Sequence, residues 1–493
     1  MAARLSPRFR HGIHDLRELS AAAAPDPARV RTIIDHPPRS EEVRRWWADL
    51  DRAGRERLSE QAPLLVGNLD GVPWPERIRA NHRTLAADIA QRRAAGRGRV
   101  SAHGPGPVFS AHTKAQYPVP GPRAKLLEER LESLAAGPGF IDRGGRARFL
   151  LAYDPRRASI VEYIGHAIAE TDDPWAPPLA DSVRAVGVFV PGNDSDLLQF
   201  EGKSHISSEL VLLHPHGTTG MIAWQGGRFP SGPLGLSSRM ARQLAPRLGR
   251  FVNGMPRRPE VRHVAFGFSF GGAVTGLAMR LGMRVDAVAH VSSAGLGAGI
   301  RSLEDLPGSA RVPHYALMAP GDLSVGPILG LDVPLGPLSL GHGANPLQTP
   351  GIVRLETGWL QHVPEGGDLG AGRSAGLLRG HATTIELWGT TAKHNLAAVL
   401  AGGRAELAAP RSPVEQLAER AALPWSPLER PGYLPRYIDI PGPLRASQGE
   451  RGGGQLSAGG SEPSEAAGEE PDAAAEGAGP VRNGPERLLA PAG

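Results

Sequence analysis

A strand, a very tight turn and a helix are predicted over residues 263–280, and this segment constrains the fold more than any other. Its sequence is HVAFGFSFGGAVTGLAMR, in which an apolar run ends at Ser269 between Gly267 and Gly271. Small residues at helical spacing follow at once. A G-x-S-x-G pattern between a strand and a helix is the sequence form of a nucleophile elbow, where strained backbone holds the serine hydroxyl clear of the sheet. Because G-x-S-x-G alone occurs by chance, this interpretation depends on the flanking strand and helix.

The chain from residue 146 onward predicts an α/β sheet covered on both faces, because short apolar runs alternate there with turns and helices. The runs 149–153 and 160–164 flank Asp154-Pro155-Arg156-Arg157 and predict a β-hairpin. Further strands are predicted at 185–190, 221–224, 261–266, 285–291, 314–318 and 352–355, and helices at 237–252, 270–281 and 392–401. About eight strands, mostly parallel after an antiparallel start, with the serine after the fifth, follow the order of the α/β-hydrolase fold.

The acidic partner of the serine is expected directly after a late strand, because the order along the chain in that fold is serine, acid, histidine. Asp322 directly follows the predicted strand that ends at Met318. A carboxylate there can accept the Nδ1–H of an imidazole and hold the useful tautomer. Asp286 and Asp332 compete, but the first begins a strand at the wrong end and the second lies in a proline-rich loop. Asp322 is therefore the predicted acid.

The general base is expected among the four histidines that follow Asp322, which are His342, His362, His381 and His394. His381 is the predicted base, since it lies in a glycine-rich loop after the last strand and before the final helix. His394, which opens that helix, is the alternative. The other two lie in turn-like sequence and are expected to be exposed.

An oxyanion hole needs two backbone N–H donors aimed at the developing negative charge. One donor is predicted to be Phe270, the residue after the nucleophile. The other is predicted to be Asn193, in the loop that follows the third strand and has the sequence Val-Pro-Gly-Asn-Asp over 190–194.

The chain before the sheet is predicted to be helical. Val43, Trp46, Trp47, Leu50 and Leu58 recur at helical spacing and predict one amphipathic helix over 41–61. Two further helices are expected at 75–95 and 123–136. The predicted organisation is a poorly ordered N-terminus over 1–40, a helical region over 41–145, a catalytic domain over 146–405, a wrapping segment over 406–443 and a disordered tail over 444–493, which has almost no large apolar residues.

Composition narrows the classes of function. With no cysteine, the chain has no disulfide, thiol nucleophile or cysteine-ligated metal. The net charge is +5, but the arginines are spread along the chain, so we do not expect a nucleic-acid partner. No apolar run is long enough to span a membrane, and no apolar leader begins the chain, so a cytoplasmic location is expected. No metal or organic cofactor is implied, and the oligomeric state stays open.

Several motifs together resemble a known family. They are Gly67-Asn68-Leu69-Asp70-Gly71-Val72-Pro73 with Arg77 and Ala80-Asn81, the Val190-Pro191-Gly192 loop, Ile222-Ala223-Trp224, the serine elbow, and His381 followed by Asn395-Leu396-Ala397-Ala398. This combination, over about 46–402, resembles the actinobacterial α/β-hydrolase family of the DUF1023 type. The resemblance implies a serine, aspartate and histidine triad, matched here by Ser269, Asp322 and His381. The residue before the serine is usually histidine in such elbows and is Phe268 here.

The sequence thus predicts a serine hydrolase that cleaves an ester or related acyl bond of a small-molecule substrate through an acyl-enzyme intermediate. Two alternatives remain open. One is a catalytically silent α/β-hydrolase-fold protein that binds a partner or small ligand, and the other is an acyltransferase that uses the same nucleophile.

Overall fold

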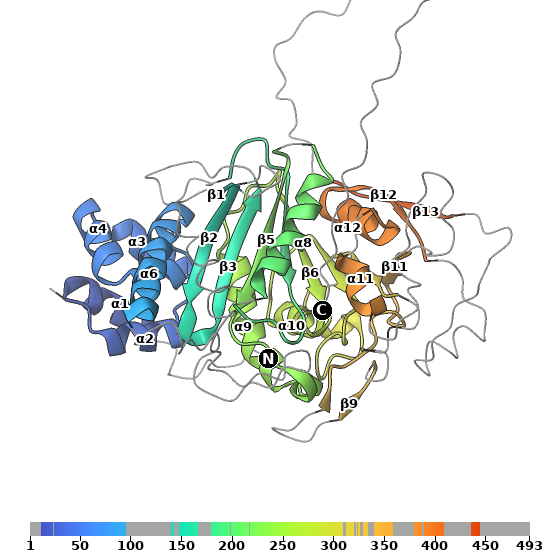
Figure 1. The fold of residues 1–493 in the computed structure, drawn as a ribbon, viewed down its shortest axis with the longest axis horizontal. Coiled ribbons are helices and arrows are strands. Elements are labelled where there is room, and N and C mark those ends of the chain that lie inside the picture. The colour runs from blue at the N-terminus through green and yellow to red at the C-terminus, as the bar shows by residue number, and fades with distance from the viewer. Residues whose placement is uncertain are drawn as a thin grey trace, which may run out of the picture. The chain divides into compact units, whose positions relative to one another are not determined.

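A nine-stranded mixed sheet forms the centre of the structure (Figure 1). The computed structural model describes residues 11–22, 24–94, 140–141, 147–165, 179–197, 199–215, 217–308, 312–319, 322, 324–325, 329–333, 340–357, 379–386, 389–408 and 435–443. The strands are β1 (Phe140–Ile141), β2 (Ala147–Asp154), β3 (Ser159–Gly165), β4 (Ala185–Val190), β5 (Thr219–Gly226), β6 (Arg262–Phe268), β7 (Ala287–Val291), β8 (His314–Leu317) and β11 (Ile352–Arg354). Their spatial order is β1-β2-β3-β5-β4-β6-β7-β8-β11.

The pairing of the strands confirms the predicted fold class. The pairs β1–β2, β2–β3 and β3–β5 are antiparallel, and every later pair in the sheet is parallel. The predicted hairpin is present, with Tyr153 opposite Ile160. All eight predicted strands are found, and the two-residue β1 adds a ninth. The crossover that places β5 between β3 and β4 puts β6, the strand before the serine, in the middle of the sheet.

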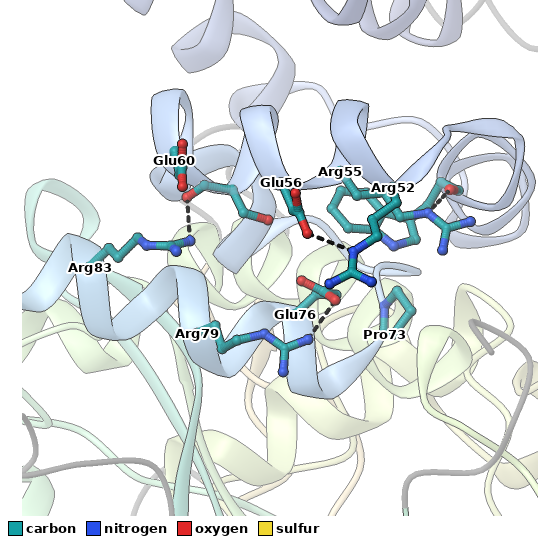
Figure 2. A pocket seen from close by; sticks show the side chains of 10 residues that line it. Arg52, Arg55, Glu56, Glu60, Pro73, Glu76, Arg79 and Arg83 are labelled. Atoms are coloured by element: carbon teal, nitrogen blue, oxygen red, sulfur yellow. Dashed lines mark hydrogen bonds and ion pairs between the residues drawn. The ribbon is translucent and has the colours of Figure 1, made fainter. Parts of the chain in front are cut away.

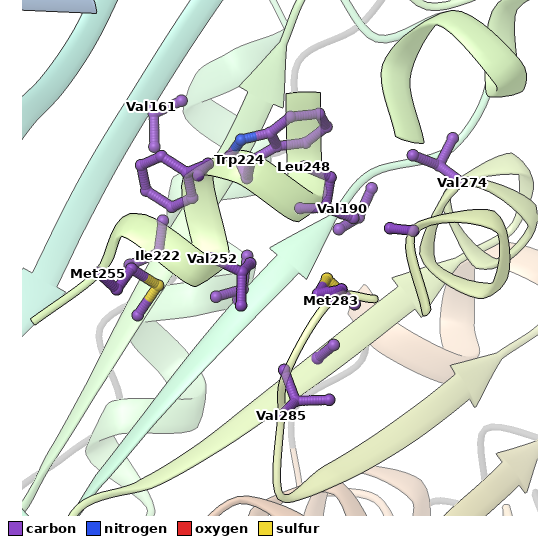
Figure 3. Packing of buried hydrophobic residues seen from close by; sticks show 14 of the residues in the cluster. Val161, Val190, Ile222, Trp224, Leu248, Val252, Met255, Val274, Met283 and Val285 are labelled. Carbon is purple, nitrogen blue, oxygen red and sulfur yellow. The ribbon is translucent and has the colours of Figure 1, made fainter. Parts of the chain in front are cut away.

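Helices cover both faces of the sheet because its strands alternate apolar side chains between them. On one face, Ala265 of β6 packs in a cluster with residues of α9 (Arg239–Gly254) and α10 (Phe270–Arg280). Figure 3 shows part of this cluster around Val190, Leu248 and Val274. On the other face, Val264 and Phe266 pack with α8 (Phe200–Leu212) and α12 (Thr391–Ala401). The two clusters hold β6 rigidly from both sides.

The N-terminal helices differ from the prediction in two ways. Residues 41–61 form two helices, α3 (Ser40–Asp49) and α4 (Arg52–Gln61), because Asp51 caps α4 by accepting a 2.7 Å hydrogen bond from the Gly54 amide. The prediction of poor order over 1–40 is wrong for 11–35, which form α1 (His11–Ala21) and α2 (Pro27–Asp35). Their apolar residues, including Leu16 and Ile33, are buried in one cluster with Trp46 and Trp47.

Two shorter elements complete this region, α5 (Pro63–Asn68) and α6 (Trp74–Ala94), which corresponds to the helix predicted at 75–95. No helix among the described residues is long and apolar enough to cross a membrane. The helix predicted at 123–136 and the tail predicted at 444–493 lie outside the described residues.

Asn81 of α6 ties the helical region to the sheet. Its side-chain NH₂ donates to the carbonyls of Gly67, at 3.0 Å, and Leu150, at 3.2 Å, and its side-chain oxygen accepts from the Tyr153 amide at 3.1 Å. A Cβ on Gly67 would lie 2.2 Å from that oxygen, so only glycine fits there. These contacts give a physical role to two residues of the motif set, Gly67 and Asn81.

A short two-stranded sheet packs against one of the helix-covered faces of the main sheet. The strand β12 (Gly403–Glu406) pairs antiparallel with β13 (Tyr437–Ile440), whose Ile440 is buried against the α8 and α12 face. Residues 437–440 therefore pack on the same body as the sheet.

A buried ion pair holds the short helix α11 (Arg379–Glu386) in place. Lys393 of α12 donates to Glu209 Oε2 of α8 at 2.7 Å and also to the carbonyl of Ile385 in α11. Both charged side chains are largely buried. One ammonium group therefore joins three helices, including the one that carries His381.

Three histidines are buried within the sheet. His290 Nε2 and His314 Nδ1, on the neighbouring strands β7 and β8, lie 3.1 Å apart, and His263 is buried at the start of β6. Burial lowers the pKa of His263 and of His314 to about 4, and it lowers the pKa of His290 well below its usual value, with a smaller effect from His314. The folded protein therefore keeps all three neutral near pH 6.

This burial predicts that the free energy of unfolding falls as the pH drops from about 6.5 to about 4. In that range the unfolded chain binds protons that the folded state excludes, so each such histidine costs about 1.4 kcal/mol of stability per pH unit. Urea denaturation at a series of pH values measures the slope. His314→Gln should make the slope shallower by about one proton, and an unchanged slope would contradict the assignment.

A second prediction concerns the Lys393–Glu209 pair. Lys393→Met should lower the free energy of unfolding by about 3–5 kcal/mol, because it removes the ammonium partner of a largely buried carboxylate, whose other oxygen faces only the exposed His205 at 3.3 Å among the described residues. The double variant with Glu209→Gln should recover part of this loss, since it removes the stranded charge. Urea denaturation at pH 7 compares the two. Equal losses in the single and double variants would mean that the charge pair is not what stabilises the helices.

Candidate active site

Ser269 lies at the junction between β6 and α10 with a backbone that non-glycine residues rarely adopt. Its φ is 53° and its ψ is −125°. Three backbone hydrogen bonds of 3.0 Å hold it there, one from the Ser269 amide to the Val291 carbonyl and two to the Ser269 carbonyl from the amides of Gly272 and Ala294. The tight turn predicted between strand and helix is therefore present, and its strain is opposed by contacts with the segment after β7.

Glycines around Ser269 allow the backbone to approach closely. A Cβ on Gly271 would lie 2.2 Å from the Val190 carbonyl oxygen, and one on Gly267 would lie 2.6 Å from the Gly272 Cα. Gly192 adds a third close approach, since its Cβ would lie 2.7 Å from the Cβ of Ser269. The loop after β4 therefore lies directly against the serine, which a bulkier residue at Gly192 would prevent.

His381 and Asp322 form a short hydrogen bond. His381 Nδ1 donates to Asp322 Oδ2 at 2.7 Å, and the Asp322 side chain is completely buried. The other carboxylate oxygen, Oδ1, accepts from the Ser324 amide at 3.0 Å. With Nδ1 as the donor, Nε2 of the imidazole carries the free lone pair. The two residues come from segments 59 positions apart in the sequence, which only the fold brings together.

The structure corrects the predicted setting of His381. The residue lies in the first turn of helix α11, not in a glycine-rich loop. Its ring packs against the ring of Phe268, with centroids 4.9 Å apart, and Phe268 in turn packs against Phe189 at 6.3 Å. Because Phe268 directly precedes Ser269, this contact places the imidazole beside the elbow.

Two of the competing residues bind elsewhere, and the third is exposed. His394 is exposed on α12. The Asp286 carboxylate accepts from the His263 amide at 2.7 Å, at the opposite end of β6 from Ser269, and the Asp332 carboxylate accepts from the Gly299 amide at 2.9 Å. Asp322 is therefore the one of the three candidate acids that the structure brings to a candidate base.

His342 is fully buried, so the expectation of an exposed residue is wrong for it. Its Nε2 donates to the Gly235 carbonyl at 2.6 Å, and its ring meets the edge of the Phe270 ring at 5.2 Å. Burial lowers its pKa. Turn-like sequence around it gave no signal of this position, since the contacts come from residues more than 70 positions away. His362 lies outside the described residues.

The predicted oxyanion donors lie in two segments that contact or adjoin Ser269. Phe270 is the first residue of α10, and Asn193 follows Gly192 in the loop that touches the serine. Among the described residues, neither amide donates to a backbone carbonyl. The loop itself is held by Asp194, whose carboxylate accepts from the Ser231 hydroxyl at 2.6 Å and the Gly232 amide at 3.1 Å.

The Ser269 side chain makes no hydrogen bond with any described residue. Its hydroxyl is therefore not used in a structural contact within that part of the chain. Candidate metal ligands gather elsewhere in the described residues, at His14, Asp15 and Glu18 of α1, and Arg29 already pairs with both carboxylates. None of the residues around Ser269 belongs to that group.

Comparison with known proteins agrees with this architecture. Residues 179–306 match a family model described as Alpha/beta hydrolase. Two uncharacterized proteins of Mycobacterium tuberculosis, MT2140 and Rv2079, are each 26% identical over 251 residues, which is 47% of this chain and 36% of each relative. The chain thus spans about a third of the length of these relatives.

Solved hydrolase structures are among the matches. A dienelactone hydrolase from Anabaena variabilis is 15% identical, with a TM-score of 0.23, over 34% of this chain and 70% of that one. Aspergillus fumigatus lipase B is 15% identical, with a TM-score of 0.27, over 84% of this chain and 90% of that one. The strand order around the elbow and the match to the Alpha/beta hydrolase family model show that the chain has the α/β-hydrolase fold.

Proposed function

We propose that this protein is a serine hydrolase that cleaves an ester or related acyl bond of a small molecule. Ser269 is the nucleophile, His381 the general base and acid, and Asp322 the residue that orients the imidazole. The 2.7 Å hydrogen bond from His381 to the buried Asp322, beside the strained backbone of Ser269, carries this proposal. The order serine, aspartate, histidine along the chain supports it too.

In the proposed first step, Ser269 Oγ attacks the acyl carbonyl carbon while His381 Nε2 takes the hydroxyl proton. The carbonyl oxygen becomes an oxyanion, which the amides of Phe270 and Asn193 stabilise by hydrogen bonds. The imidazolium, held by the Asp322 carboxylate, then gives its proton to the leaving alcohol as the bond to the acyl carbon breaks. The acyl group is left as an ester of Ser269.

In the second step, a water molecule replaces the alcohol. His381 takes one proton from the water, whose oxygen attacks the acyl carbon, and then returns the proton to Ser269 Oγ as the acyl-enzyme bond breaks. The products are a carboxylic acid and the free enzyme. The resemblance of the motif set to the DUF1023-type family supports a triad of this kind, and it does not specify the acyl chain.

The proposal predicts covalent capture of Ser269 by a fluorophosphonate probe, with one adduct per chain in intact-protein mass spectrometry. Ser269→Ala should abolish the adduct, because the activated oxygen is gone. If the folded wild-type protein gives no adduct at all, the catalytically silent binding protein becomes the better description. Circular dichroism of both proteins confirms that the comparison is made between folded chains.

His381→Ala should lower the hydrolysis of a short p-nitrophenyl ester by about a hundredfold to ten thousandfold, because the general base is removed. The matched control is His394→Ala, which should keep the wild-type rate because that side chain is exposed on α12. Loss of activity in the His394 variant with activity retained in the His381 variant would reverse the two roles.

Phe268 is predicted to position the imidazole through ring contact. Phe268→Leu keeps apolar volume but loses the flat face against His381, so kcat should fall by about tenfold while KM changes little. Phe268→Tyr retains the face and should stay near the wild-type kcat. A KM increase with kcat unchanged in the leucine variant would instead place Phe268 in substrate binding.

A further inference from the structure

A small cavity lies at the seam between the helical region and the sheet, away from Ser269. Its lining comes from the N-terminal helices, from β2, β3 and β5, and from α9. The volume is about 50 Å³. A water needs roughly 10–15 Å³ in this measure, so the cavity holds only a few water-sized groups.

The lining of this cavity carries excess positive charge. Four arginines, Arg77, Arg157, Arg247 and Arg250, face two carboxylates, Asp70 and Asp154. The difference of four cations and two anions is a net charge of +2. Two residues outside the lining also contact it, since Arg31 pairs with Asp154 and Asp35 pairs with Arg157. The charges of Arg31 and Asp35 cancel, so the net charge of +2 is unchanged.

The two carboxylates are already engaged by other arginines. Arg77 donates to Asp70 Oδ1 at 3.1 Å, and Asp154 pairs with Arg31 and, at 3.6 Å, with Arg157. Within the part of the chain that the structure describes, the Arg247 side chain donates only to the Gly226 carbonyl, at 3.3 Å.

Arg250 lacks even a contact of that kind. It makes no hydrogen bond or ion pair with any described residue, and its Nε is buried without a partner. Burial lowers its pKa, and nearby Arg247 lowers it further, although Asp70 acts in the opposite direction. The pKa of neighbouring Arg157 falls to about 9 through burial and then through Arg247, Arg31 and Arg250. A buried polar group without a partner is costly, so the observed arrangement suits a further anion.

A larger pocket in the helical region lacks this property. It has a volume of about 450 Å³ and lies between α4 and α6, where arginines and glutamates alternate. Figure 2 shows Arg52 paired with Glu56 and Arg79 paired with Glu76, at 2.8 and 2.6 Å. Arg55 and Arg83 donate to the backbone carbonyls of Trp47 and Ser59. Every arginine there has a partner, so that pocket presents no comparable demand for an anion.

We propose that the seam cavity is a binding site for a small oxyanion of the phosphate type, held by Arg250 and Arg247. Guanidinium groups present planar pairs of N–H donors that match the oxygens of phosphate, and the size of the cavity suits one compact tetrahedral group. The anion would neutralise the excess charge and connect α9 with the N-terminal helices and β2. This site is independent of the hydrolase chemistry proposed above.

Thermal unfolding of the full chain with increasing inorganic phosphate tests the site. Binding to the folded state alone raises the Tm in a saturable way, as the ligand-linkage relation requires. Sodium chloride at matched ionic strength is the salt reference. A phosphate response no larger than that of chloride would overturn the proposal.

Variants assign the response to the cavity. Arg250→Gln should weaken the apparent phosphate affinity at least tenfold and, without phosphate, should raise the Tm, because a partly buried cation whose Nε has no partner is removed. Arg79→Gln in the larger pocket is the matched control and should keep the wild-type phosphate response. If Arg250→Gln does not fold, Arg247→Gln serves in its place with the same expected loss of affinity. An unchanged phosphate affinity in the cavity variant would overturn the proposal.

Two further ligands identify the chemistry. If glycerol 3-phosphate raises the Tm as phosphate does, the site accepts the phosphoryl end of a larger molecule. If only phosphate raises the Tm, the site binds the free ion. Succinate raising the Tm where phosphate does not would overturn the proposal in favour of a carboxylate site.

Discussion

The backbone of Ser269 is the constraint on which the candidate site depends. A φ of 53° on a residue with a side chain is unfavourable, and it persists only where the surroundings determine it from several directions. Here the hydrogen bonds to Val291, Gly272 and Ala294 do so, and they require the strand, the helix and the segment after β7 to come unusually close. The glycines at 192, 267 and 271 are the consequence, since each lies where a Cβ would collide with a neighbouring atom. The glycines at the elbow and the close backbone contacts around Ser269 therefore follow from the same steric requirement.

The imidazole beside this serine is placed by packing as much as by hydrogen bonding. The contact with Asp322 sets which ring nitrogen carries the proton, while the ring of Phe268 sets where the imidazole lies. Helix α11, which carries His381, is short, and Lys393 ties its C-terminal half to α8 and α12. A phenylalanine before the serine is thus compatible with an ordered imidazole, because a flat apolar face can fix the position of a ring.

The helical region belongs to the same compact unit as the sheet because polar side chains tie the two together across their seam. Asn81 satisfies backbone groups of Gly67, Leu150 and Tyr153 at once, and Arg77 reaches both the Gly67 carbonyl and Asp70. Such contacts specify one docking geometry, whereas apolar packing alone tolerates small shifts. The same seam brings together more arginines than carboxylates, and this excess of positive charge distinguishes the seam cavity from the larger pocket between α4 and α6.

The sequence by itself determined the eight main strands, the elbow and the choice of Asp322 and His381 as candidates, because apolar periodicity and turn chemistry are local and strand order follows from the fold class. Other features were decided only by tertiary structure. The break between α3 and α4 depends on a cap at Asp51, and the order of α1 and α2 depends on apolar residues that meet Trp46 and Trp47 from elsewhere in the chain. The burial of His342, the contact of Phe268 with His381 and the gathering of arginines at one seam join residues far apart in sequence. No local pattern encodes such contacts, since they arise from how packed elements meet.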